Sequence, residues 1–586
     1  LATIVIFVPL AFLSGVTGGF FSALALTMAC ALTVSFLVAL LAVPLLTDRL
    51  SRTAKSSAAS QPPQWYQGFS ERYATLAAAT LRHPKRMWIG VGVLLALGAL
   101  AFWRLPSGFM PPMDEGGFIL DYRAAPGTSL AETDRLLRQV EDLIRATPEV
   151  ATYSRRTGLQ LGGGLTEANE GDFFIKLKPP PRRDIEEVMT DLRQRIESQV
   201  PGLPIEILQL MEDLIGDLTA VPQPIEVKLF GPDLARLQTL APQVASKLKD
   251  IHGLVEIQDG LRVAGDALEV RVDRPRAALE GIDADSIAQQ LNALIGGAVV
   301  GQVQSGEELL DIRLWSPQGL RARIESLRDL QLAASDGHTF PLRRVADVRV
   351  AAGQPQIVHE NLEQMIAVTA RLEGRDLGSA IKEVKKVVAG MNLPRSVRVD
   401  YGGLYAEQQR SFRGLAAVFA AAVLLVTALL LYLYEEWSVV LAILATILLS
   451  AAGVFIGLWI TQTELNISAL MGLTMIVGIV AEIAVFYFSE LALLPGRDAN
   501  SLIDAGRHRL RPILMTGSIA ILALLPLALG LGTGSAMQTP LAIAIISGLV
   551  AALPVVLLVM PALYGVVLRS APPVRHLDAA DHVPQY

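Results

Sequence analysis

One carboxylate lies in the middle of the long apolar segment Leu470–Leu494, which contains the run MGLTMIVGIVAEIAVFYFSEL. An ionisable side chain near the centre of a bilayer costs about 2.5–3.5 kcal/mol on insertion scales, so it normally faces a bundle interior, a partner or a water path. Glu482 is therefore a candidate for an ion or proton relay. The alternative is a neutral carboxyl group that is hydrogen-bonded inside a helix bundle.

Other kinds of chemistry find little support in the sequence. It has no H-E-x-x-H, G-x-S-x-G or P-loop pattern, which argues against an enzyme. No pair of histidines has metal-ligand spacing, and Cys30 is the only cysteine, so no metal site is predicted. The formal charge of −6 argues against nucleic acid as a partner, because nucleic-acid-binding proteins carry basic patches.

The composition indicates a protein of the lipid bilayer, since 52% of the residues are hydrophobic, 18% are charged and the mean hydropathy is +0.43. A helix needs roughly 20 apolar residues to cross the hydrocarbon core. The predicted membrane segments are Leu1–Leu13, Phe20–Leu46, Met87–Trp103, Leu415–Leu433, Val439–Ile460, Ala469–Leu491, Ile513–Leu531 and Pro540–Leu568.

Basic loops predict the orientation of these segments. Loop 47–86 is rich in Lys and Arg, and the loop after the Glu482 segment carries Arg497, Arg507 and Arg509, so both are expected in the cytoplasm. Counting passes from either loop places the long stretch between the third and fourth segments outside. Within the first loop, Trp65–Leu81 is predicted to be an amphipathic helix on the membrane surface.

An internal repeat relates the first two apolar segments to the last two. Ile4–Pro44 aligns with Ile521–Pro561 without gaps and matches Pro9 with Pro526, Gly15 with Gly532, and Pro44 with Pro561. Parallel duplication of this kind is a transporter architecture. Because the chain also starts inside an apolar segment, we expect one whole module preceded by the last two helices of another, with an amino-terminal part missing.

Two βαββαβ patterns fill the external stretch, the second split by an inserted piece at about Gly265–Gln354. The first comprises Phe118–Arg123, Leu130–Ala146, Val150–Thr157, Phe173–Leu177, Ile185–Gln199 and Ile205–Leu208. The second comprises Ile225–Phe230, Leu234–Lys249, Val255–Gln258, Met365–Glu373, Leu377–Met391 and Val397–Tyr401, and the inserted piece is expected to contain helix Ile282–Ile295 and strands near Ile312–Trp315 and Val345–Val350. Two such split-βαβ subdomains side by side form a cleft.

The predicted fold class is an α-helical polytopic membrane domain plus an α+β external domain of split-βαβ (ferredoxin-like) subdomains with an inserted subdomain. The expected domains are two transmembrane helices in 1–46, a cytoplasmic linker in 47–86, a transmembrane helix in 87–104, the first external subdomain in 105–222, the second in 223–264 and 355–410, the inserted subdomain in 265–354, five transmembrane helices in 411–568 and a cytoplasmic tail in 569–586.

Six motifs in this order resemble the resistance-nodulation-division (RND) efflux permeases. They are FVPLAFLSGVTGGFF (Phe7–Phe21), GFMPPMDEGGF (Gly108–Phe118), PIEVKLFG (Pro224–Gly231), ELNISALMGLTMIVGIVAE (Glu464–Glu482), RLRPILMT (Arg509–Thr516) and LPLALGLGTGSAMQTPLAIAII (Leu525–Ile546). The resemblance implies a homotrimeric secondary transporter of the Gram-negative inner membrane, with porter subdomains in the periplasm. It also implies a docking subdomain, a periplasmic adaptor (membrane fusion) protein and an outer-membrane channel as partners, and no cofactor besides the proton motive force.

The resemblance also implies a proton relay in the membrane. The family's paired aspartates belong to a pass that this chain lacks, and the position of Glu482 looks like a lysine in the drug-exporting branch but an acid in the heavy-metal branch. A third carboxylate would raise at least one pKa and could carry the proton itself. Arg511 matches a family arginine, with a positive-inside anchor as the alternative. Thr516 and Ser518 follow it, and their hydroxyls either bridge a proton path or satisfy backbone carbonyls.

For the cargo, loop Leu161–Asp172 looks like the family's mobile loop beside the binding pocket, which makes Glu167, Asn169, Glu170 and Phe173 candidate cleft residues. A solvated hairpin is the alternative. Copper and silver exporters of similar architecture place methionines in the cleft, because thioethers suit soft ions. Here only Met211 stands near the expected cleft.

The predicted function is therefore proton-driven export of small organic, amphipathic compounds. A heavy-metal cation efflux permease is the alternative. A truncated scaffold subunit that does not transport is the second alternative.

Overall fold

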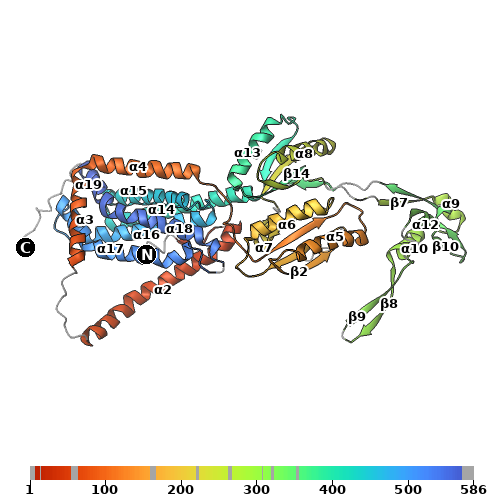
Figure 1. Ribbon diagram of the computed structural model, residues 1–586, viewed down its shortest axis with the longest axis horizontal. Coiled ribbons are helices and arrows are strands. Elements are labelled where there is room, and N and C mark those ends of the chain that lie inside the picture. Colours follow the sequence, from red (N-terminus) through yellow and green to blue (C-terminus); the bar gives the residue numbers. More distant parts are fainter. Residues whose placement is uncertain are drawn as a thin grey trace, which may run out of the picture.

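The structure is a computed structural model that describes residues 7–13, 15–53, 64–158, 166–219, 223–261, 265, 267–306, 308–317, 323–351, 356–532 and 534–570. It is elongated, with a helical bundle at one end, two α/β subdomains in the middle and a small distal domain at the other end (Figure 1). The chain leaves the bundle after α4 (Pro84–Arg104) and returns to it with α14 (Leu404–Tyr434).

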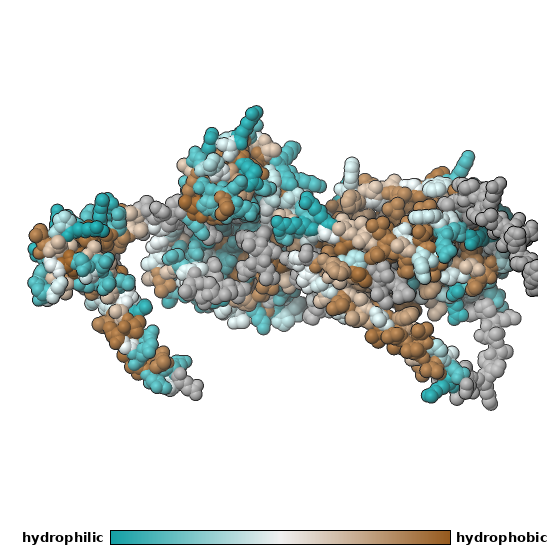
Figure 2. Space-filling view, turned by 180° about the vertical axis from the view of Figure 1, so that it is seen from behind, coloured by the Kyte–Doolittle hydropathy of each residue, from teal (hydrophilic) through white to brown (hydrophobic). Residues whose placement is uncertain are grey.

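The described part of the bundle contains seven segments that are long and apolar enough to span a membrane. Besides α4 and α14 it is built from α2 (Gly15–Thr53), α15 (Trp437–Ile460), α16 (Ile467–Leu491), α17 (Ala499–Ala528), α18 (Thr539–Pro554), a π-helical turn (Val555–Val559) and α19 (Met560–Ser570). Of the eighth predicted segment, Leu1–Leu13, residues 1–6 lie outside the described part of the chain, and residues 7–13 begin as a helix. Apolar side chains cover much of the visible surface of the bundle, as expected for a multi-pass membrane protein (Figure 2).

Helices α15 and α16 form the centre of the bundle. In the most apolar 18-residue stretch of α15, 67% of the residues are buried. In the corresponding stretch of α2, none is buried. Three glycines let these helices approach α18 closely, since a Cβ atom on Gly453, Gly457 or Gly472 would overlap a small residue of α18. Small residues are the usual means of close helix contact in membranes.

The surface helix expected at Trp65–Leu81 is present as α3 (Gln64–Arg82). It lies across the end of the bundle that is remote from the external part (Figure 1). Its face with Tyr73 and Ala77 is buried, while Trp65 and Phe69 are exposed. This two-sided pattern fits a helix that lies on a membrane surface.

The first external subdomain has the predicted split-βαβ topology. Its elements are β1 (Gly117–Arg123), α5 (Leu130–Arg145), β2 (Val150–Thr157), β3 (Glu170–Leu177), α6 (Ile185–Gln199), β4 (Ile205–Gln209) and an additional helix, α7 (Leu210–Thr219). The antiparallel sheet has the order β2-β3-β1-β4. Alternation along the strands puts Phe118, Leu120 and Tyr122 into the core beneath α5 and α6.

The second subdomain repeats this order with a core of its own. It consists of β5 (Ile225–Phe230), α8 (Leu234–Lys249), β6 (Leu254–Gln258), β13 (Val358–Glu360), β14 (Glu363–Leu372), α13 (Leu377–Gly390) and β15 (Arg398–Gly402). Strand β5 lies between β14 and β15, and β6 and β13 both pair with β14. Side-chain caps begin the helices of both subdomains, at Ser129, Asp184, Asp233 and Asp376.

The inserted piece forms the distal domain. It contains β7 (Ala267–Val272), α9 (Arg274–Leu279), α10 (Ala284–Gly296), β8 (Ala298–Ser305), β9 (Glu308–Leu314), α12 (Ile324–Arg328), β10 (Gln331–Ala333), β11 (Thr339–Pro341) and β12 (Ala346–Ala351). Strand β8 was not predicted. It pairs with β9 in a hairpin that projects from the domain (Figure 1).

Candidate functional site

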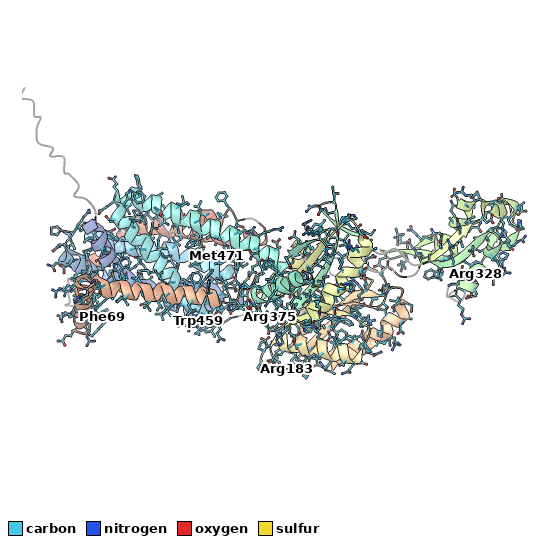
Figure 3. The ribbon with its side chains drawn as sticks, turned by 90° about the horizontal axis from the view of Figure 1, so that it is seen from above. Phe69, Arg183, Arg328, Arg375, Trp459 and Met471 are labelled. Atoms are coloured by element: carbon cyan, nitrogen blue, oxygen red, sulfur yellow. The ribbon has the colours of Figure 1, made fainter. Side chains whose placement is uncertain are left out.

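The candidate site is the cleft between the two external subdomains, at the point where they meet the bundle. A cavity of about 280 Å³ opens there. Its lining comes from the connector 108–113 after α4, from α6 and α7 of the first subdomain, from β14 and α13 of the second, and from Glu464 before α16. Arg375, directly before the N-cap residue Asp376 of α13, marks this junction in Figure 3. The cavity therefore touches every part of the molecule except the distal domain.

Four methionines line this cavity: Met110, Met113, Met189 and Met211. The expectation that only Met211 lies near the cleft is therefore wrong. The connector that carries Met110 and Met113 precedes the first strand in sequence, but it folds back against α7, where the Glu115 carboxylate accepts the backbone N–H of Met211 at 2.9 Å. Met189 is contributed to the cavity lining by α6 of the first subdomain.

A row of carboxylates crosses the sheet of the first subdomain. The strand register places Asp121 of β1 directly between Asp172 of β3 and Glu206 of β4. Their neighbours Phe173, Tyr122 and Ile207 point into the core, so the three acids lie on the opposite face, toward the second subdomain. Like charges directly opposite each other on a sheet are destabilising. Such a row is retained only where something else compensates its charge.

The two ends of this row are neutralised by arginines. Asp172 accepts two hydrogen bonds from Arg156, at 2.8 and 2.6 Å, and Glu206 pairs with Arg371 at 3.1 Å. The central acid is different: burial, followed by repulsion from Glu206, Asp213 and Asp172, raises the pKa of Asp121 to about 8. Asp121 is therefore largely protonated at neutral pH in this arrangement.

The arginines belong to a network that crosses the cleft. Arg371 of β14 pairs with Glu206 and, at 2.5 Å, with Glu212 of α7. Arg193 of α6 pairs with Glu256 at 2.6 Å and with Glu373 at 2.5 Å, both in the second subdomain. Among the described residues, no group of three His, Cys, Asp or Glu side chains is arranged to hold a metal ion.

The pKa of Asp121 predicts how stability depends on pH. In the folded protein this group keeps its proton up to about pH 8, while its ordinary pKa is 3.8, so the folded state holds the extra proton between these values. Stability must then fall as pH rises through this window. We expect Tm to fall less between pH 5 and pH 8 in Asp121→Asn than in wild type. For a domain of 150–250 residues, each kcal/mol of unfolding free energy corresponds to about 2–4 °C in Tm. Parallel Tm curves for wild type and variant would contradict the assigned pKa.

The residues predicted from the loop 161–172 fall into different places. Residues 159–165 lie outside the described part of the chain. Glu167 is exposed, and Glu170 forms an ion pair with Arg123 at 2.7 Å. Asn169 is buried and donates to the carbonyl of Ala124 at 2.8 Å, so it holds the backbone. Phe173 is fully buried in the core of the first subdomain, because it alternates with Asp172 along β3, and it does not line the cleft.

The predicted relay residues lie on surfaces of the bundle that one described chain leaves open. Glu482 is exposed and belongs to a stripe along α16, spaced by three or four residues, whose other members are also the less buried ones: Met475, Ile479, Phe486 and Ser489. Such spacing marks one face of a helix. Arg511, Thr516 and Ser518 are exposed on α17, and the Thr516 hydroxyl donates to the carbonyl of Pro512 at 3.0 Å. The Thr516 hydroxyl thus satisfies a backbone carbonyl of its own helix.

A short connector joins the helix of Glu482 to the cleft. Leu465, just before α16, donates its N–H to Pro106 at 2.9 Å and accepts that of Gly108 at 3.3 Å. The same strand is tied to the second subdomain, where Ser107 donates to Asp376 and accepts from Gly378. The following residues of this connector include Met110 and Met113, two of the four methionines of the cavity. Backbone hydrogen bonds therefore link the start of α16 to the cavity wall.

The alternation of residue types in the sequence carries a signal for the acid row. In β1, β3 and β4 the apolar residues that fill the core alternate with Asp121, Asp172 and Glu206. This alternation alone puts all three acids on the face away from α5 and α6. Only the register of the strands could bring them side by side.

Comparisons with known proteins agree with this architecture. The sequence model of the AcrB/AcrD/AcrF family matches residues 1–568. The cobalt-zinc-cadmium resistance protein CzcA of Cupriavidus metallidurans is 27% identical over 97% of this chain and 55% of its own length. The nickel and cobalt resistance protein CnrA of the same organism is 26% identical over 97% of this chain and 54% of its own. The chain thus spans about half the length of these relatives.

The fold is likewise known from solved structures. A crystal structure of a heavy metal efflux pump superposes with a TM-score of 0.82 at 24% sequence identity and covers 97% of this chain and 58% of that one. A second crystal form of a heavy metal efflux pump gives a TM-score of 0.77. These matches show the fold, with its membrane bundle and porter subdomains.

The relatives overturn the predicted cargo. Export of small organic, amphipathic compounds is contradicted by curated relatives that cover nearly the whole chain and are named for cobalt, zinc, cadmium and nickel. The prediction failed because it counted one methionine near the cleft and missed the acid row, which the strand register alone creates. Since the family match extends over residues 1–568, the chain belongs to the AcrB/AcrD/AcrF family, the RND permeases whose motifs it carries.

Proposed function

We propose that the whole protein exports divalent heavy-metal cations as the permease of a tripartite efflux pump. The observation that carries this proposal is the row Asp172, Asp121 and Glu206 at the cleft, beside a cavity lined by four methionines. The names of the relatives point to the same class of cargo. A divalent cation can take the place of the Asp121 proton, whereas a neutral apolar compound has no charge to offer these carboxylates.

The donor types favour borderline metal ions. Carboxylate oxygens bind Zn²⁺ and other divalent ions, while thioethers suit softer ions such as Cu(I). Here the methionines line the cavity, while the carboxylates of the row lie on the neighbouring sheet face, where Asp172 is almost completely buried. This arrangement supports Zn²⁺, Co²⁺, Ni²⁺ or Cd²⁺ rather than a monovalent soft ion.

For the driving force, we propose that protons pass through the bundle by way of Glu482, with Arg511, Thr516 and Ser518 as further relay residues. A carboxylate within an apolar span supports this role. Its exposed stripe on α16 leaves room for helices of the longer protein, on which the paired aspartates implied by the family resemblance would lie. The connector at Leu465 would pass the resulting movement of α16 to the cleft.

We further propose a homotrimer in the Gram-negative inner membrane, with the external subdomains in the periplasm and an adaptor protein and an outer-membrane channel as partners. The hairpin β8–β9 supports association with a second copy of the chain. Its exposed apolar side chains are Val299, Val300, Val303, Leu309, Leu310, Ile312 and Leu314. A projecting two-stranded hairpin of this composition is stable only when another surface covers it.

A resistance panel tests the proposed cargo. The full-length protein, with its adaptor and channel, is expressed in a Gram-negative host that lacks its own metal and drug exporters. We expect higher minimal inhibitory concentrations for Zn²⁺, Co²⁺, Ni²⁺ or Cd²⁺ and unchanged ones for dyes, detergents and antibiotics. Resistance to the organic compounds alone would contradict metal export, and an assembled complex without any resistance would favour the scaffold alternative.

A further inference from the structure

Two buried arginines connect the external subdomains crosswise. Arg193 reaches from the first subdomain to Glu256 and Glu373 of the second, and Arg371 reaches from the second to Glu206 and Glu212 of the first. Each subdomain therefore supplies one guanidinium and two carboxylates to the other. The ion pairs of this set join the two subdomains across the cleft.

The two arginines and Glu256 are nearly buried, whereas Glu206, Glu212 and Glu373 are 18%, 31% and 33% exposed. The side chains of Arg371, Arg193 and Glu256 are 5%, 8% and 1% exposed. Breaking a buried ion pair leaves uncompensated charge, which makes such pairs costly to separate one partner at a time. The subdomains are thus held closed as long as all partners stay in place.

The backbone is shaped to present these groups. Glu256 has φ of +49°, in the left-handed region, and the pairing of β6 with β14 is irregular between Thr369 and Arg371. Non-glycine residues adopt such backbone angles only where their surroundings require it. The Glu256 carboxylate also accepts the backbone N–H of Ile207 on β4, at 3.2 Å. One carboxylate therefore binds both the arginine and the strand of the facing subdomain.

Glu206 belongs to both the acid row and the network. It is the cross-strand neighbour of Asp121, and it pairs with Arg371. A divalent cation at the row would need the same carboxylate that Arg371 occupies, and the two positive charges would repel each other at this distance. The cation and the guanidinium are therefore competitors for one group.

We propose that Arg371 and Arg193 form a latch that holds the cleft closed when it is empty, and that a divalent cation opens the latch by displacing Arg371 from Glu206. This inference rests on the proposed function for the identity of the cation, but not for the latch itself. Arg371 is thereby a positioning residue that sets the minimum charge of the cargo. To displace Arg371 from Glu206, an ion must carry more than the single positive charge of the guanidinium. Monovalent ions are rejected on this ground.

The distance across the cleft tests the latch. Glu197 of α6 and Lys249 of α8 are exposed and flank one groove between the subdomains, so each is replaced by Cys and spin-labelled in the full-length protein, with Cys30 changed to Ser. We expect one short distance in the metal-free protein, a longer one after addition of ZnCl₂, and the longer one without Zn²⁺ in Arg371→Gln. An unchanged distance in Arg371→Gln would overturn the latch.

A matched control removes an equally well-bonded arginine from elsewhere. Arg183 forms two hydrogen bonds with Glu149, at 2.6 and 3.0 Å, within the first subdomain, and it lies at the outer edge in Figure 3. Arg183→Gln is expected to keep the short distance. Two further variants control for misfolding of Arg371→Gln. Arg371→Lys retains the charge, and Arg193→Gln breaks the ion pairs with Glu256 and Glu373. We expect an intermediate distance in Arg371→Lys and a long distance in Arg193→Gln. A short distance in both variants would overturn the proposal.

Zn²⁺ affinity separates the latch from the proposed function. If Arg371 competes with the cation, Arg371→Gln binds Zn²⁺ at least about tenfold more tightly than wild type in calorimetric titration, and equal or weaker binding would overturn the competition. If neither protein binds Zn²⁺ but Arg371→Gln opens the cleft, the latch stands and metal export fails. If wild type binds Zn²⁺ without any change in distance, metal binding stands and release of the latch fails.

Discussion

Glu482→Gln abolishes proton-coupled export in the full-length protein, with an expected loss of at least ~10-fold in the transport rate, which corresponds to about 1.4 kcal/mol of barrier. The reason is the position of this carboxylate within the apolar span Ile467–Leu491. A charged group there is tolerated only where it faces a polar path or partner. Glutamine keeps the shape and the hydrogen-bonding capacity but cannot release a proton, so assembly of the proposed trimer should be unchanged.

The same helix provides a control for this variant. Glu490, near the end of α16, binds Arg509 at 2.9 Å and His508 at 2.9 Å, which identifies it as a carboxylate that anchors the end of the helix. Glu490→Gln should therefore keep most of the transport. Rates are compared in proteoliposomes with an imposed proton gradient. Wild-type transport by Glu482→Gln would remove this residue from the relay.

Asp121→Asn lowers the affinity for Zn²⁺ or Co²⁺ by at least ~10-fold, or about 1.4 kcal/mol of binding free energy. Asp121 is the central acid of the row. Asp172 and Glu206 each form an ion pair with an arginine, whereas Asp121 forms none among the described residues. It is protonated when the cleft is empty, and a cation would take the place of this proton. An amide cannot supply the negative charge.

A surface acid of the same strand region serves as the control for Asp121→Asn. Asp114 precedes β1, is itself exposed and binds Arg182 at 2.5 Å. Asp114→Asn should leave the affinity unchanged in calorimetric titration of the purified protein. Equal affinities of Asp121→Asn and wild type would show that the cargo does not bind at the row.

Local patterns were sufficient to predict much of the fold. Helix α8 and strand β5 have the predicted bounds, because the capping residue Asp233 and the strict change from strand to helix periodicity are both local signals. Hairpin β8–β9 was only half predicted. Both of its faces are exposed, so the alternation that marks a half-buried strand is absent from β8.

The site was predicted less well, for a physical reason. Asp121, Asp172 and Glu206 lie far apart in sequence and become neighbours only through the register of three strands. The crosswise pairs of Arg193 and Arg371 depend in addition on how two subdomains face each other. Glu482, in contrast, was recognisable because a single charge in an apolar helix stands out locally.

Metal flux in proteoliposomes tests the central claim most directly. The full-length permease is reconstituted with a Zn²⁺-sensitive dye in the lumen, and a proton gradient is imposed across the membrane. The proposed function predicts Zn²⁺ flux opposite to the downhill movement of protons in wild type and its loss in both Glu482→Gln and Asp121→Asn. Movement of a lipophilic dye under the same gradient, with no flux of Zn²⁺ or Co²⁺, would contradict it.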